Sequence, residues 1–145
     1  MSEHTTNRVL GVDLGAIHTG LAITDALRML AHPFATIHAN SVRVTTQRIS
    51  RIIMTEQISE VVLGLPRNMD GTHGVAVKRT HTFAKLLMAH VKCPIHFWDE
   101  RWTTVAAQQA LRKAGKRAKA CKAIVNQVAA QILLQSWLDA QSFRL

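Results

Sequence analysis

Asp13, Asp99 and Glu100, three of the nine acidic residues, lie on or at the ends of expected buried strands. Asp13 interrupts the apolar run at residues 8–14, and Asp99 and Glu100 directly follow the apolar segment at residues 94–98. An unpaired carboxylate is costly to bury, so such a group normally shifts its pKa, pairs with a cation or binds a metal. These three side chains are therefore the first candidates for chemistry.

Asp13 has a glycine two residues away on either side, Gly11 and Gly15. Glycine removes side-chain bulk where a ligand or another backbone approaches closely. Residues 15–20 are typical of a tight turn into a second apolar run at residues 21–24, which places Asp13 on the first strand of a hairpin. The alternative is an aspartate on an edge strand that only caps a turn.

Asp99 and Glu100 are neighbours, so they point to opposite sides if the strand continues through them. Only one of them is then expected to face Asp13, and the other can pair with Arg101. Carboxylates that meet from separate elements form a hard-oxygen site for Mg²⁺ or Mn²⁺. Two such ions can stabilise the attacking and leaving oxygens in phosphodiester cleavage.

The net charge of +9 lies entirely in the second half of the chain. Residues 1–72 contain six basic and six acidic residues, whereas residues 73–145 contain twelve and three. A basic segment without interspersed acids attracts polyanions and binds phosphate backbones, which favours a nucleic-acid-binding surface over a solvated face that only aids solubility. Together with the acidic residues above, this surface fits a nuclease. The expected backbone-binding residues of this segment are Arg112, Lys113, Lys116, Arg117, Lys119 and Lys122.

The composition predicts one domain, residues 1–145, in a reduced cytoplasmic protein. No apolar run is long enough for a membrane span, so no membrane partner is expected, and the polar N-terminus does not look like a signal peptide. Cys93 and Cys121 have no CxxC spacing, and the eight histidines are scattered, so neither residue type is assigned to a metal.

Hydrophobic periodicity predicts the element order β-β-β-α-β-α-β-α-α. Strands are expected at 8–14, 21–25, 35–38, 60–66 and 94–98, and helices at 41–57, 75–90, 103–115 and 118–140. An antiparallel opening followed by alternating strands and helices predicts an α/β mixed sheet with helices on both faces. In such a sheet the end of segment 94–98 can lie beside the strand that carries Asp13.

Four sequence blocks, in this order, resemble the YqgF (RuvX-like) family, and together they extend from Val9 to Asp139. They are GVDLG with GLA at residues 11–22, VLGLPRNMDGT at 62–72, DERWTT at 99–104 and VNQVAA with LQSWL at 125–138. The GVDLG motif alone is a weak signal, but the second and third blocks at this spacing are specific. The resemblance implies an RNase H-like fold with a mixed five-stranded sheet, related to Holliday junction resolvases.

The resemblance also implies a hydrolase, a divalent-metal-dependent endonuclease that acts on structured nucleic acid with Mg²⁺ or Mn²⁺. Family members are described as nucleases that trim the 5′ end of pre-16S rRNA in ribosome biogenesis and as Holliday junction resolvases. The expected function is therefore rRNA processing, and the alternative is junction resolution in DNA recombination and repair. The partner would be pre-rRNA or branched DNA, and the protein would act as a monomer or homodimer.

By position, Asp13 resembles the first-strand catalytic carboxylate of the family and Glu100 the second, with Asp99 as the fallback. Asp13 and Glu100 are the implied metal ligands. The third family carboxylate corresponds to Asn126, which is the remaining expected site residue. An amide offers a neutral carbonyl oxygen but no charge and no carboxylate base, so metal affinity and turnover should both be lower.

Where the family has a Lys-Arg type pair in the first turn, this chain has Ile17 and His18. A protonated His18 can replace the lost phosphate contact, and Arg67, Asn68 and Arg101 are further expected contacts to nucleic acid. For Arg67 and Asn68 the alternative is a purely architectural loop. Trp102, next to Arg101, is either a base-stacking platform or ordinary packing.

Two other hypotheses remain beside the nuclease. The two departures from the family pattern favour a catalytically weakened member that binds nucleic acid without cutting it. The GVDLG motif also opens the phosphate loop of actin-like and sugar-kinase ATPases. Those proteins need two such domains around the nucleotide, which 145 residues cannot supply.

Overall fold

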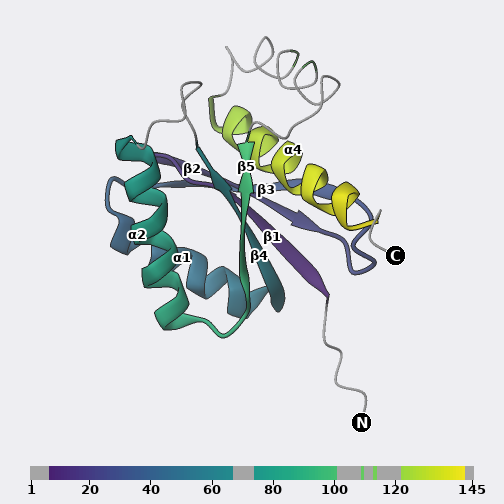
Figure 1. Ribbon diagram of the computed structural model, residues 1–145, viewed down its shortest axis with the longest axis horizontal. Coiled ribbons are helices and arrows are strands. Elements are labelled where there is room, and N and C mark those ends of the chain that lie inside the picture. Colours follow the sequence, from purple (N-terminus) through teal and green to yellow (C-terminus); the bar gives the residue numbers. More distant parts are fainter. Residues whose placement is uncertain (1–6, 67–73, 101–108, 110–112, 114–121, 143–145) are drawn as a thin grey trace.

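The computed structural model describes residues 7–66, 74–100, 109, 113 and 122–142 of the chain. A five-stranded sheet lies between α1 and α2 on one face and α4 on the other (Figure 1). The strands are β1 (Arg8–Asp13), β2 (His18–Thr24), β3 (Ala31–His38), β4 (Ile58–Leu65) and β5 (Ile95–Asp99). The helices are α1 (Val42–Thr55), α2 (Val75–His90) and α4 (Lys122–Ser142).

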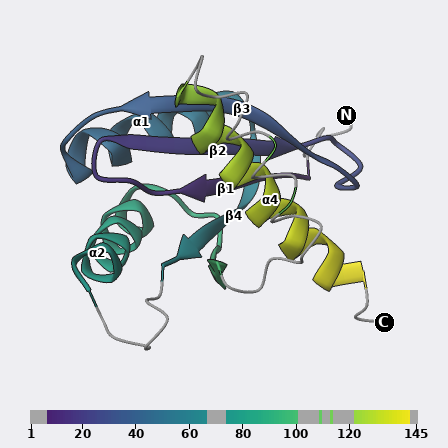
Figure 2. The same cartoon turned by 90° about the horizontal axis from the view of Figure 1, so that it is seen from above.

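The strand order is β3-β2-β1-β4-β5. β1, β2 and β3 form an antiparallel meander, whereas β4 pairs in parallel with both β1 and β5. Figure 2 shows α4 running across the sheet on the side away from α1 and α2. This arrangement confirms the mixed five-stranded sheet with helices on both faces.

The central strand β1 is buried on both faces, and its side chains alternate between two cores. Leu10 and Val12 pack with α1 and α2, whereas Val9 packs with α4. Because β1 lies between β2 and β4, the alternative of an edge-strand aspartate at position 13 is wrong.

The second and third strands are longer than the sequence pattern indicates. β2 begins at His18 because residues 18–20 pair with residues 36–38 of β3, so the connecting turn is shorter than residues 15–20. β3 begins at Ala31 and includes Pro33, which an edge strand tolerates because a proline has no N–H to donate. The pairing shifts register beside this proline.

The helix boundaries follow simple local signals. Ser41 caps α1, because its hydroxyl accepts a hydrogen bond from the backbone N–H of Val44. The helix expected at residues 103–115 lies outside the described part of the chain, apart from Gln109 and Lys113. Among the described helices, none has both the length and the apolar character needed to cross a membrane.

Candidate active site

Asp13 is the last residue of β1 and pairs with Gly20 of β2. Side chains along a strand alternate between its two faces, so Asp13 lies on the same face as Gly11, two residues earlier. This is the face that α4 covers. A Cβ atom added at Gly11 would lie 2.8 Å from the Cβ of Leu134 on that helix. The strand therefore presents the Asp13 carboxylate on the α4 face, at the carboxyl end of the parallel strands.

Glu100 reaches Asp13 from the other side of β4. It follows β5 directly, and β5 is separated from β1 by one strand. Gly64 of β4 lies between them, and a Cβ atom added there would lie 3.2 Å from Oε1 of Glu100. The missing side chain leaves the space through which Glu100 forms a hydrogen bond with Asp13. The segment that ends at Asp99 is thus close to β1 but is not its neighbour.

The electrostatics of the pair are set by burial and by like charge. Burial raises the pKa of Asp13 to about 8, and the charge of Glu100 and the hydrogen bond between the two carboxyl groups act in the same direction. Asp13 therefore holds a proton near neutral pH. Two acidic oxygen donors forced together in this way are a suitable site for a divalent cation, because a cation can replace the shared proton.

Asp99 is the buried neighbour of this pair. Only 4% of its surface is exposed, and it pairs with Leu65 at the end of β5. Of the two adjacent acids, Glu100 is the one that forms the hydrogen bond with Asp13.

Asn126 comes to the same place from α4. A Cβ atom added at Gly20 would collide with the backbone carbonyl group of Asn126. Because Gly20 is the partner of Asp13, the second turn of α4 rests directly on the strand pair that carries the carboxylate. No third His, Cys, Asp or Glu side chain joins Asp13 and Glu100 within the residues that the structure describes.

The expected nucleic-acid contacts are only partly within the described residues. His18 is exposed at the start of β2, where it lies against His38 of β3. Lys113 is exposed, and Lys122 is the first residue of α4. The other expected contacts lie outside the described part of the chain; they are Arg67, Asn68, Arg101, Arg112, Lys116, Arg117 and Lys119.

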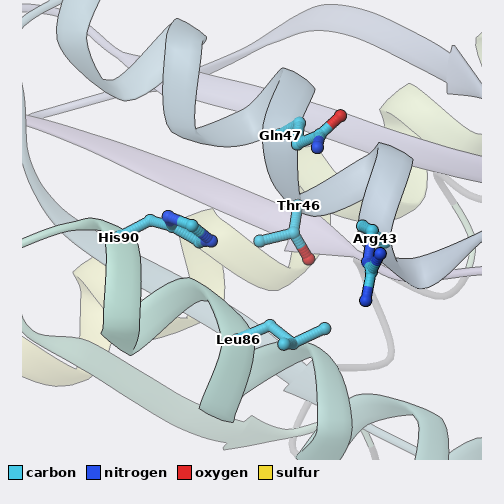
Figure 3. Close-up of a pocket in the computed structure, with 5 residues that line it drawn as sticks. All are labelled: Arg43, Thr46, Gln47, Leu86 and His90. Atoms are coloured by element: carbon cyan, nitrogen blue, oxygen red, sulfur yellow. The ribbon is translucent and has the colours of Figure 1, made fainter.

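A pocket on the opposite face of the sheet is separate from this site. It has a volume of about 330 Å³ and lies between α1 and α2 (Figure 3). Its lining residues are Arg43, Thr46, Gln47, Leu86 and His90. The sheet separates this pocket from the Asp13 carboxylate.

The site could be assembled only in part from the sequence. The approach of Glu100 depends on Gly64, and the approach of Asn126 depends on Gly20. Neither glycine carries a donor group, so neither was expected as a site residue. Their signal is indirect, because a glycine inside a strand pattern often marks a close approach by another group.

Comparison with known proteins shows which family has this arrangement. The RuvX family profile, described as a Holliday junction resolvase, matches residues 7–140. The chain belongs to the RuvX family. This result confirms the resemblance read from the four sequence blocks.

Relatives of this RuvX-family protein cover almost the whole chain. One from Paracoccus denitrificans, named "Putative pre-16S rRNA nuclease", is 39% identical over 138 residues, which are 95% of this chain and 87% of the relative. One from Chloroflexus aggregans with the same name is 38% identical over 141 residues, 97% of each chain.

Solved structures confirm the RNase H-like fold. RuvC of T. thermophilus in complex with a Holliday junction substrate superimposes with a TM-score of 0.63 over 94% of this chain and 96% of RuvC, at 12% identity. The Fowlpox virus resolvase in complex with Holliday junction DNA gives 0.58 over 92% of this chain and 98% of the resolvase, at 10% identity. At these identities the similarity concerns the fold alone.

Proposed function

We propose that this RuvX-family protein is a divalent-metal-dependent nuclease that processes the 5′ end of pre-16S rRNA. The observation that carries the proposal is the hydrogen-bonded pair of Asp13 and Glu100 on the α4 face of the sheet. Membership of a nuclease family supports phosphodiester hydrolysis. The name shared by the relatives supports this RNA as the substrate.

Asp13 and Glu100 are the residues that we assign as metal ligands. Both carry hard oxygen donors, which suit Mg²⁺ or Mn²⁺. When bound, such a cation stabilises negative charge on the phosphoryl oxygens. Asp13 must lose its proton before it can bind the cation, so we expect the site to fill more readily as the pH rises through the raised pKa of about 8.

Asn126 is the third member of the proposed site. Its backbone lies against Gly20, the residue of β2 that pairs with Asp13. An amide oxygen can join the coordination as a neutral ligand, but it adds no charge to hold a second ion. We therefore propose that the site holds one cation and binds it more weakly than a site of three carboxylates would.

Outside the metal site, the proposed contacts bind nucleic acid through the negative charge of its phosphate backbone. We assign the basic residues of segment 112–122 to this role, together with His18, Arg67, Asn68 and Arg101. Such contacts hold a phosphate backbone without reading its sequence. They fit an RNA or a DNA substrate equally well, so the choice of rRNA depends on the relatives.

The proposed substrate is a ribosomal RNA precursor, so we place the protein in the cytoplasm. We further propose that residues 1–145 form one domain, and that this domain cuts RNA as a monomer. Resolution of a four-way junction would instead require a homodimer, because two symmetric cuts need two matched sites.

A cleavage assay on two labelled substrates tests the proposed function. One substrate is a pre-16S rRNA fragment that spans the mature 5′ end, and the other is a four-way DNA junction. We expect Mn²⁺- or Mg²⁺-dependent cutting of the RNA at or near the mature end, and no cutting in EDTA. Paired symmetric nicks in the junction, with the RNA intact, would overturn the rRNA assignment and favour a resolvase.

A second candidate function is favoured by Asn126 and by the absence of a basic pair at Ile17 and His18. A protein with these changes can bind nucleic acid without hydrolysing it. Salt-sensitive binding of the same RNA fragment, with no cutting in any divalent cation, would support this candidate and contradict the nuclease.

A further inference from the structure

Two histidines that are 20 residues apart in the sequence meet at the end of the β2–β3 pair. His18 is the first residue of β2 and His38 is the last residue of β3, and they are direct cross-strand partners. Their Nδ1 atoms lie 2.7 Å apart. The ring centroids are separated by 4.7 Å, with the ring planes at 85°. Both side chains are exposed to solvent.

The backbone around the pair is well fixed. The N–H of Ala39 donates a hydrogen bond to the carbonyl oxygen of Ile17 at 2.9 Å, which extends the pairing beyond the two histidines. The carbonyl oxygen of His38 accepts a hydrogen bond from Arg48 of α1 at 3.1 Å. The positions of both Cα atoms are therefore set by the sheet, and only the imidazole rings need to adjust to a ligand.

The two Nδ1 atoms share one hydrogen-bonding proton, and a metal ion can take the place of that proton. At 2.7 Å the Nδ1–H of one ring donates a hydrogen bond to the Nδ1 of the other. Both nitrogens therefore face the space between the two rings. A Zn²⁺ ion binds imidazole nitrogen at about 2.0–2.1 Å, which places two nitrogen ligands of a tetrahedral site roughly 3.3 Å apart. The Nδ1 atoms of His18 and His38, 2.7 Å apart, would need to separate by roughly 0.6 Å, which small rotations of the two exposed rings allow.

We propose that His18 and His38 form a binding site for a borderline divalent cation such as Zn²⁺, Ni²⁺ or Cu²⁺. Imidazole pairs favour these ions over Mg²⁺, which prefers oxygen ligands. The proposed site is distinct from the Asp13–Glu100 pair, because it has a different donor set and lies beyond Gly20 along β2. Its remaining coordination positions are filled by solvent, since both rings are exposed. The phosphate contact proposed for His18 and this metal site are alternative uses of the same ring.

The sequence pattern gives no sign of this site. The two histidines are not at a helical or CxxC-like spacing, so a search along the chain does not connect them. The register of β2 with β3 creates the pair. A one-residue shift in that register would move one of the rings to the opposite face of the sheet.

Titration of the EDTA-treated full-length protein with ZnCl₂ tests this inference. The experiment uses calorimetry together with two-dimensional NMR of the imidazole nitrogens, in the wild type and in an Asp13→Asn background. We expect Zn²⁺ to shift the Nδ1 signals of His18 and His38 in both proteins. We also expect His18→Ala and His38→Ala each to weaken binding by about tenfold or more, because each variant removes the chelate.

His32→Ala is the matched control, because His32 is an exposed histidine on the same strand as His38. This variant should bind Zn²⁺ like the wild type. Unchanged Zn²⁺ affinity in His18→Ala would overturn the inference, as would Zn²⁺-induced shifts that leave both Nδ1 signals in place. Both substituted histidines are exposed, so circular dichroism should show that the variants remain folded.

Discussion

At the scale of single residues, the central feature is a carboxyl group that is kept protonated by its surroundings. Asp13 is partly buried on the α4 face and forms a hydrogen bond with Glu100, and its pKa is raised to about 8. An arrangement of this kind lowers the stability of the ionised form, and a cation can compensate for that cost. The pair is therefore better suited to binding a metal than to stabilising the fold.

The stability of the metal-free protein should depend on this proton. In the unfolded chain an aspartate titrates near its ordinary value of 3.8, whereas in the folded chain Asp13 holds its proton up to about pH 8. The Asp13 contribution to stability should therefore fall as the pH rises from about 4 to about 8, by at most about 1.4 kcal/mol per pH unit. Above that range the loss should be constant.

Urea denaturation in EDTA at several pH values checks this prediction, with Asp13→Asn as the comparison. The variant has no titrating group at this position, so its stability relative to the wild type should increase steadily between about pH 4 and about pH 8. A constant difference between the two proteins over that range would show that Asp13 is ionised in the folded state.

The identities of the acidic residues could be predicted from the sequence, but their meeting could not. Asp13 and Glu100 were recognisable because charged groups are unusual beside apolar strands. Their contact depends on the register of β4 with β5 and on the absence of a side chain at Gly64. Strand register is a tertiary property, and local hydrophobic patterns do not determine it.

At the scale of secondary-structure elements, two glycines determine how closely other groups approach the site. Gly20 lies beneath the backbone of α4, and Gly64 lies beneath the side chain of Glu100. The two positions differ in what a new methyl group would meet. At Gly20 it would meet backbone atoms of Asn126, whereas at Gly64 it would meet the ends of flexible side chains.

Alanine substitutions should therefore separate stability from activity. Gly20→Ala should lower the free energy of unfolding by about 3 kcal/mol, because α4 must move away from the sheet. Gly64→Ala should cost only about 1 kcal/mol but should reduce cleavage strongly, because it displaces Glu100 from Asp13. Thermal denaturation and single-turnover cleavage, measured on the same samples, check both. Equal stability losses in the two variants would contradict this account.

A second cluster on the α4 side joins four elements at the amino end of β4. Glu60 accepts hydrogen bonds from Arg28 and from His96, the latter at 2.9 Å. His96 stacks on Trp137 of α4 with the ring centroids 5.3 Å apart, and Arg28 lies over the same indole. A pocket of about 490 Å³ opens beside this cluster. These contacts tie the β2–β3 turn to the edge strand β5 and to α4.

Glu60→Gln should destabilise the protein by about 1 kcal/mol at neutral pH, a modest loss because the ion pair is partly exposed. Burial alone would raise the pKa of Glu60, but the hydrogen bonds and charges of His96 and Arg28 outweigh burial and lower it. The ion-pair contribution is therefore present above the ordinary glutamate range and is lost as the pH falls through the lowered pKa.

Denaturation of Glu60→Gln and of Glu56→Gln at neutral and acidic pH checks this prediction. Glu56 pairs with Arg8 at 3.3 Å in a more exposed position, so its substitution should have a smaller effect at neutral pH. A Glu60→Gln effect that persists unchanged in acid would show that the carboxylate charge is not what stabilises the cluster.

The elements themselves were largely predictable. The apolar runs at β1 and β4 and the amphipathic α1 and α2 have strong local periodicity, and the structure has them close to the expected bounds. The starts of β2 and β3 were missed because His18 and Pro33 do not favour strands locally. Pairing between the two strands overrides those local preferences.

At the scale of the whole molecule, the charge is divided unequally between the two halves of the chain. The second half carries the whole excess of +9. Reversing the charge at Lys116, Arg117 and Lys119 should weaken RNA binding and make it less dependent on salt, because fewer counterions are released. Electrophoretic mobility shift at several salt concentrations gives the slope directly.

Charge reversal at Lys78 and Lys85 provides the matched control when it is compared with reversal at Lys116 and Lys119 alone, since both pairs change the net charge equally. These two lysines are exposed on α2, on the face of the sheet opposite to Asp13. If the basic segment at residues 112–122 holds the substrate, the α2 variant should bind with nearly the wild-type salt slope. An equal effect from both sets of substitutions would indicate general attraction by net charge rather than a defined binding surface.

The central claim is that Asp13 and Glu100 hold the cation that this nuclease uses. The most direct test is the single-turnover cleavage rate of a labelled pre-16S rRNA fragment in Mn²⁺, for the wild type, Asp13→Asn, Glu100→Gln and Asn126→Asp. We expect the first two variants to bind RNA normally but to lose cleavage by a factor of about 10² or more. Asn126→Asp should cut faster than the wild type. Cleavage by Asp13→Asn at the wild-type rate would contradict the account.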